Sequence, residues 1–215
     1  MIKAVVFDLD GTLLYTLMDL HDAVNHAIST YGYKEITLAE ARAFVGNGIK
    51  KLVERSLKGD TSKLDLCYLE FQKYYYDHCN VKTRKYDGID DLISFLRENN
   101  IKIGVVSNKR YDTLNILVHA HFNDAFPVII GDGEGFKRKP DPETLIEVAR
   151  RLDVNLNEMC YIGDSDVDVK TVLNTGCMGK FVDYGFRERS VLEECGAKEI
   201  YSSPLELRDA IKREI

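Results

Sequence analysis

The chain has 215 residues, of which 45% are hydrophobic and 30% are charged, and it carries a formal net charge of −6 at pH 7. This acidic balance argues against broad binding to a nucleic-acid backbone, which requires a dense positive face. The length suits one large domain or one domain that carries a smaller insert.

The cysteines and the N-terminus predict a cellular compartment. The five cysteines are odd in number and form no C-x-x-C pair, which is typical of reduced thiols rather than of a disulfide or zinc framework. The first residues lack the apolar stretch of a secretory signal, and no run approaches the ~20 apolar residues of a membrane span. We therefore expect a cytoplasmic protein with no membrane partner.

The first predicted element is a β-strand over 4–9 that ends in acid. Asp8 and Asp10 follow an apolar, β-branched run, and a glycine comes directly after them. Residues two apart on a strand point the same way, so we expect both carboxylates to crowd one spot at the carboxyl end of this strand. Two like charges at that distance require a neutralising partner.

A helical segment follows the strand. Apolar residues recur at three and four positions from Leu17 to Ile28, Thr37 and Glu40 match a capping box, and further helices are predicted after Gly48 and over 63–78. We expect a small helical bundle inserted as a unit over 15–82. The aromatic residues of its last helix are expected to form the packing face of the bundle.

From residue 83 onward, strands and helices alternate. The strands are continuous apolar runs, and helices are expected over 89–98, over 111–121, after Pro142, over 187–195 and from Pro204. This alternation predicts a doubly wound α/β domain with a parallel sheet covered on both faces, built from residues 1–14 and 83–215.

Polar residues gather at the predicted strand ends, where open parallel sheets bind ligands. They are Asp8 and Asp10, Ser107 and Asn108, and Asp164 and Asp168. Four carboxylates in one place would repel one another unless a cation neutralised them. The oxygen-rich set, without thiol or histidine, suits Mg²⁺.

Four stretches resemble, in order, the motifs of the haloacid dehalogenase superfamily. They are Asp8-Leu-Asp10-Gly-Thr12, Val105-Val-Ser107-Asn108-Lys109, Lys139-Pro140-Asp141-Pro142 and Gly163-Asp164-Ser165-Asp166-Val167-Asp168. The helical insert resembles the type 1 cap of that family. Looser similarities, over 45–48 and 185–197, point to its phosphoglycolate phosphatase branch. The resemblance implies a Rossmann-like catalytic core with strand order 3-2-1-4-5.

The resemblance also implies a role for each core residue. Asp8 would attack the phosphorus of a small phosphomonoester and become an aspartyl phosphate, and Asp10 would act as general acid and base. Catalytic Ser107 and Lys139 would bind and neutralise the phosphoryl oxygens. Thr12 and Asn108 would join them in substrate binding.

Metal and cap residues are implied in the same way. Mg²⁺ would be held by Asp8, the Asp10 carbonyl, Asp164 and, through water, Asp168. In relatives with this type of cap, a loop of the insert meets the leaving group, which points to Gly46, Asn47 and Gly48 as substrate-binding residues. The protein is expected to act as a monomer or a homodimer.

Several alternative functions remain open at this stage. Within the family, the chain could be a phosphosugar mutase, a pyrophosphatase or another small-metabolite phosphatase. A mutase would return the phosphoryl group to substrate, and Thr12 mildly favours hydrolysis. From another class, a receiver-like signalling module also clusters acids around Mg²⁺, but receivers are shorter and carry no helical insert. A non-catalytic binding protein of the same fold is the remaining option.

Overall fold

The structure is a computed structural model that describes residues 1–46 and 48–215. Its contacts separate two compact units. The sheet unit consists of Met1–Leu14 and Lys85–Ile215, and the helical unit consists of Tyr15–Arg84. The prediction for Asn47 lies outside the described residues.

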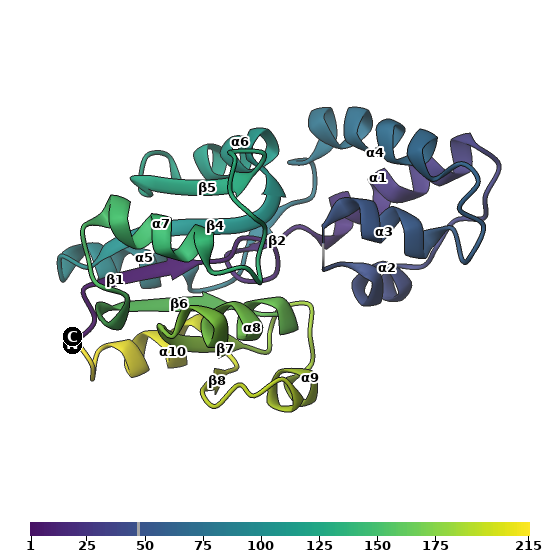
Figure 1. The fold of residues 1–215 in the computed structure, drawn as a ribbon. Helices are drawn as coiled ribbons and strands as arrows, with labels where there is room; N and C mark the ends of the chain where they lie inside the picture. The colour runs from purple at the N-terminus through teal and green to yellow at the C-terminus, as the bar shows by residue number, and fades with distance from the viewer. Residues whose placement is uncertain (47) are drawn as a thin grey trace. The chain divides into compact units, whose positions relative to one another are not determined.

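A six-stranded sheet forms the centre of the sheet unit (Figure 1). Its strands are β1 (Ala4–Phe7), β4 (Lys102–Arg110), β5 (Val128–Asp132), β6 (Met159–Gly163), β7 (Met178–Val182) and β8 (Ile200–Tyr201). They lie in the order β5-β4-β1-β6-β7-β8, and all neighbours pair in parallel. The predicted order 3-2-1-4-5 is confirmed, with β8 as a sixth strand beside β7.

Helices cover both faces of this sheet, as the continuous apolar strands predict. They are α5 (Ile89–Glu98), α6 (Tyr111–Phe122), α7 (Glu143–Leu152), α8 (Asp166–Thr175), α9 (Arg189–Glu194) and α10 (Pro204–Ile211), with a short 3-10 turn, η1 (Leu156–Glu158). Ala4 and Val6 of β1 pack in one cluster with residues of α7, α8 and α9. Phe7 meets Phe126, which in turn meets Phe122 of α6 on the other side.

Strand β1 ends at Phe7, two residues before the predicted end. The Asp8 amide still continues the ladder by donating to the Ile162 carbonyl at 2.8 Å. The carbonyl of Leu9 then accepts from the amides of the next turn, including those of Leu13 and Leu14. Asp10 therefore lies in a turn, and the expectation that one strand face carries both carboxylates is wrong.

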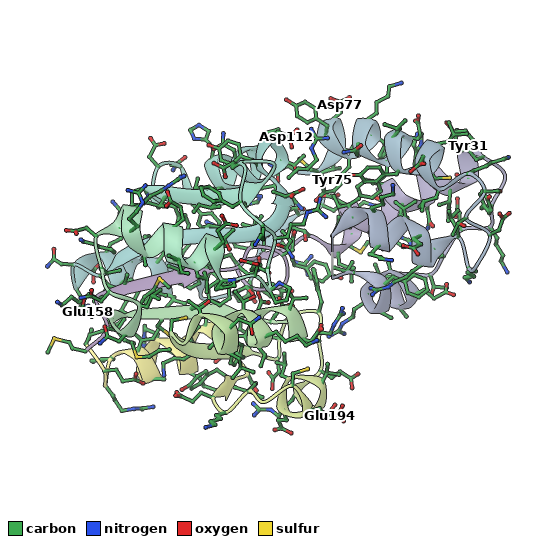
Figure 2. The ribbon with its side chains drawn as sticks, viewed as in Figure 1. Tyr31, Tyr75, Asp77, Asp112, Glu158 and Glu194 are labelled. Atoms are coloured by element: carbon green, nitrogen blue, oxygen red, sulfur yellow. The ribbon has the colours of Figure 1, made fainter. Side chains whose placement is uncertain are left out.

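The helical unit contains α1 (Leu17–Thr30), α2 (Leu38–Phe44), α3 (Ile49–Ser56) and α4 (Leu64–His78). The capping box at α2 is present, since Thr37 Oγ1 accepts from the Glu40 amide at 3.2 Å. Figure 2 shows Tyr75 on the inner side of α4 and Asp77 on its outer side, and Tyr75 is only 1% exposed. Tyr76 is half exposed, so only part of the aromatic set forms the packing face.

Short strands β2 (Leu14–Tyr15) and β3 (Arg84–Lys85) form a separate two-stranded sheet. Among residues 1–46 and 48–215, no helix combines the length and the apolar character that a membrane crossing requires. All five cysteines are free thiols, and four of them are buried.

A buried carboxylate ties the two ends of the helical unit together. Asp19, in the first turn of α1, accepts hydrogen bonds from the amides of Val81, Lys82 and Thr83 at 2.8–3.1 Å. The Thr83 hydroxyl donates to the same carboxylate at 2.8 Å. A carboxylate bound by several donors in a buried place stabilises both segments strongly.

We expect Asp19→Asn to lower the free energy of unfolding by about 2–3 kcal/mol. The NH₂ group of asparagine would face backbone N–H groups, and two donors cannot form a hydrogen bond. Asp22→Asn is the matched control, since it removes a solvent-accessible ion pair with Lys82 and a longer contact, 3.5 Å, with the His21 ring, and it should cost under about 1 kcal/mol. Denaturant unfolding measures both, and hydrogen exchange at residues 81–83 locates the change. Equal effects of the two substitutions would contradict this reading of Asp19.

Candidate active site

The carboxyl ends of three neighbouring strands carry the polar residues of the site (Figure 1). Asp8 follows β1, Ser107 to Lys109 form the end of β4, and Asp164 follows β6. Lys139 comes from the loop before α7. Parallel pairing of β1 with β4 and β6 brings these ends to one edge of the sheet.

Three buried carboxylates meet at this edge. Asp8, Asp164 and Asp168 each offer a ligand oxygen, and these oxygens lie within 4.8 Å of one another. The Lys139 ammonium lies 3.0 Å from Asp8 Oδ1 and 2.7 Å from Asp168 Oδ1. Lys139 thus pairs with two of the three acids, so the cluster has more carboxyl groups than cationic partners.

Asp168 is held by protein donors on both of its oxygens. Oδ1 accepts from Lys139 and from the Tyr161 hydroxyl, at 2.7 and 2.9 Å. Oδ2 accepts from the amide and the hydroxyl of Ser165, at 3.0 and 2.6 Å, in the capping box that begins α8. Both oxygens of Asp168 are therefore fixed by protein donors.

The Asp164 carboxylate lies tightly against the backbone at Gly11, Gly185 and Phe186. The Phe186 amide donates to Oδ2 at 2.6 Å, and the Thr12 hydroxyl lies 3.3 Å from Oδ1. A Cβ at Gly11 or at Gly185 would overlap this carboxylate, so only glycine fits on either side of it. Thr12 is fully buried, and its hydroxyl supports the acid rather than facing open space.

Asp10 has a lysine partner of its own that sequence reasoning missed. The Lys109 ammonium lies 3.0 and 3.1 Å from the two Asp10 oxygens, and the Lys109 side chain is 1% exposed. The side chain of Asp10 therefore lies outside the cluster of three acids. A buried lysine requires a counter-charge, but the sequence does not reveal that Lys109 is buried.

Ser107 and Asn108 lie where β4 ends. Ser107 is buried, 6% exposed. The Asn108 side chain binds the backbone of Lys139, accepting from its amide at 2.8 Å and donating to its carbonyl at 2.9 Å. The Asn108 side chain thereby fixes the loop that presents Lys139 to the acids.

The acids differ in how readily they ionise. Burial, together with the charges of Asp168 and Asp10, raises the pKa of Asp8 from 3.8 to about 6, against the opposing effect of Lys139. Burial and the nearby Asp168 and Asp8 raise the pKa of Asp164 well above its usual value. Burial alone would raise the pKa of Asp168 too, but the charge and hydrogen bond of Lys139 lower it.

The residues present fit a divalent cation. Asp8 Oδ1 is buried and, among the described residues, receives no directed hydrogen bond, although the Lys139 ammonium lies close. Buried carboxylate oxygens without a donor are the ligands that a hard cation accepts. A cation beside Asp8 and Asp164 would also offset the excess negative charge.

The residues predicted for the cap belong to the helical unit. Gly46 and Gly48 have φ values of 107° and 86°, and they flank the position that lies outside the description. Both values fall in the region that favours glycine, and Gly48 is the residue directly before α3.

The chain is similar to known proteins in sequence and in fold. A family model described as haloacid dehalogenase-like hydrolase matches residues 5–181. A phosphoglycolate phosphatase from Nitrosospira multiformis is 34% identical over 205 residues, covering 91% of this chain and 90% of that protein. One from Cereibacter sphaeroides is 34% identical over 215 residues, covering 97% of each. A crystal structure from Lactobacillus delbrueckii subsp. bulgaricus matches with a TM-score of 0.93 and 32% identity, covering 97% of this chain and 98% of that one.

Proposed function

The chain belongs to the haloacid dehalogenase-like hydrolases and is a phosphoric monoester hydrolase, and we propose that it hydrolyses a small phosphomonoester through an aspartyl phosphate on Asp8. The observation that carries this mechanism is the position of Asp8, buried at the end of the central strand with an oxygen 3.0 Å from Lys139. With a pKa of about 6, Asp8 is ionised and nucleophilic at neutral pH.

The proposed reaction has two displacements at phosphorus. In the first, an Asp8 oxygen bonds to phosphorus while Asp10 gives a proton to the departing alcohol oxygen. In the second, Asp10 takes a proton from a water that attacks the same phosphorus and frees Asp8. The Ser107 hydroxyl and the backbone amide of Asn108 bind the phosphoryl oxygens, and Lys139 neutralises their charge.

Mg²⁺ is the proposed cation. Asp8 and Asp164 would hold it with the Asp10 carbonyl, and Asp168 would bind it through water. When bound, it supplies positive charge to the phosphoryl oxygens. The excess of buried acid over Lys139 supports this assignment.

Phosphoglycolate is the first substrate candidate, because the relatives from Nitrosospira multiformis and Cereibacter sphaeroides are named for that activity. We propose that residues 1–14 and 83–215 form the catalytic core and that residues 15–82 form a cap. Gly46, Asn47 and Gly48 are the cap residues proposed to contact the leaving group. We also propose a cytoplasmic protein, a monomer or a homodimer.

Product analysis with a substrate panel tests this function. Phosphoglycolate, hexose phosphates, pyrophosphate and nucleoside monophosphates are each incubated with the protein and Mg²⁺. Release of inorganic phosphate, fastest from phosphoglycolate, is the expected result. Isomerised hexose phosphate without free phosphate would indicate the mutase instead, and no turnover of any compound would contradict the proposal.

Lys109→Met is expected to lower kcat/KM by about 10- to 100-fold, since Asp10 loses the charge-assisted contact that holds its carboxylate. Lys102→Met is the matched control at the other end of β4, where the ammonium donates to the Leu152 and Asp153 carbonyls. Steady-state kinetics on both variants check the prediction. Equal rates for Lys109→Met and the unmodified protein would exclude a role for this contact.

A further inference from the structure

A tyrosine hydroxyl lies directly beside the catalytic lysine. Tyr161, in the middle of β6, is fully buried, and its Oη lies 2.7 Å from Lys139 Nζ and 2.9 Å from Asp168 Oδ1. An ammonium group can only donate, so Tyr161 accepts from Lys139. Its single hydroxyl proton then serves Asp168, the nearer of two acceptors, since the Val106 carbonyl is 3.4 Å away.

The hydroxyl keeps that proton across the pH range of interest. Burial and the charge of Asp168 raise the pKa of Tyr161 well above its usual value. Packing alone does not require the hydroxyl, because phenylalanine would fill nearly the same volume within this apolar strand. A buried hydroxyl costs free energy unless it is hydrogen-bonded, and here both of its bonds lead into the site.

Lys139 is thus held at both ends. The Asn108 side chain binds its backbone, and Tyr161 and Asp168 accept two of the three hydrogens on its ammonium group. One hydrogen remains for an oxygen of a group bound at Asp8, whose Oδ1 lies 3.0 Å from the ammonium nitrogen. Its direction is set by the two bonds already made.

We propose that Tyr161 is a positioning residue for phosphoryl transfer, whose hydroxyl orients the Lys139 ammonium so that its remaining hydrogen meets the phosphoryl group at Asp8. This inference rests on the proposed function. Phosphoryl transfer depends mainly on positioned charge, so a small misalignment of Lys139 weakens binding of the transition state more than binding of substrate.

The test compares Tyr161→Phe with Tyr201→Phe. The control also removes one hydroxyl, but from a tyrosine that donates to Glu199 and lies on β8. Turnover of a phosphomonoester is measured together with inhibition by orthovanadate, which imitates the five-coordinate phosphorus. For Tyr161→Phe we expect kcat to fall about tenfold with KM changed less than about twofold, and the vanadate inhibition constant to rise about tenfold, as for one lost hydrogen bond. For Tyr201→Phe all three should stay unchanged.

The vanadate constant separates positioning from stability. A variant that is only partly folded has fewer active molecules and a lower apparent kcat, but its remaining sites bind vanadate as before. An unchanged constant, or a Tyr161→Phe protein that fails to fold, would therefore overturn the proposal. Absence of phosphatase activity in the unmodified protein would instead contradict the proposed function itself.

Discussion

Asp8→Asn is expected to remove the phosphatase activity and, at the same time, to make the metal-free protein more stable. The amide cannot form the acyl phosphate, so the rate should fall at least about 10³-fold, as for other lost nucleophiles. Release of inorganic phosphate measures this loss. The backbone bond to β6 is retained, because the backbone N–H of residue 8 still donates to the Ile162 carbonyl.

The gain in stability follows from the raised pKa of Asp8. Protonated Asp8 stabilises the folded state fully below pH 3.8, and this contribution is lost as the pH rises through about 6. At pH 7 the buried carboxylate therefore destabilises the fold, by up to about 3 kcal/mol for a pKa moved from 3.8 to about 6. Asparagine, always neutral, avoids this penalty.

Thermal unfolding in the presence of a chelator checks the sign. At pH 7 the Asp8→Asn protein should melt about 5–10 °C above the unmodified protein, and the difference should shrink toward zero near pH 4. Asp166→Asn is the control, because Asp166 lies outside the acid cluster and pairs with Lys170 and, at 3.6 Å, with Arg187. The melting-temperature difference between the Asp8→Asn protein and the unmodified protein should thus be larger at pH 7 than at pH 4. A difference that is smaller at pH 7 would show that other groups already compensate the buried charge of Asp8.

Removal of divalent cations is expected to abolish turnover and to lower the melting temperature. Three buried acids around one lysine have an excess of charge that a cation removes, so a bound cation stabilises the folded state. At 100 times its dissociation constant, Mg²⁺ should add about 2.7 kcal/mol to the free energy of unfolding. Calorimetry with and without a chelator measures this shift, and phosphate release measures the activity.

Asp164→Asn tests whether the thermal shift with Mg²⁺ depends on the acid cluster. It removes one carboxylate charge from the cluster, so the thermal shift with Mg²⁺ should largely disappear, whereas Asp166→Asn should retain it. If the melting temperature of the unmodified protein is the same with and without Mg²⁺, the acids are neutralised by protons alone. In that case the proposed magnesium site would be wrong.

Much of the fold was predictable from local pattern. Continuous apolar strands alternating with helices indicate a covered parallel sheet, and the six parallel strands confirm it. The helix over 89–98 is found as predicted, because its apolar spacing is regular. The end of β1 was misplaced because Leu9 is as apolar as the strand, while its carbonyl in fact collects the amides of the following turn.

The site was predictable only where residue type signals chemistry. Asp8, Asp164 and Lys139 stand at strand ends or before a proline, and the structure brings them together. Lys109 and Tyr161 gave no such signal, because a lysine at a strand end is usually solvated and a tyrosine in an apolar strand is usually core. Their roles depend on partners distant in the chain, such as Asp10, 99 residues before Lys109.

The central place of β1 has a consequence for synthesis. Its neighbours, β4 and β6, begin at Lys102 and Met159, so β1 is synthesised well before either and must wait for both. The helical unit is continuous in the chain and is complete at Arg84, before either neighbour exists. At about 5–20 residues per second, β1 therefore spends several seconds with unpaired edges during translation.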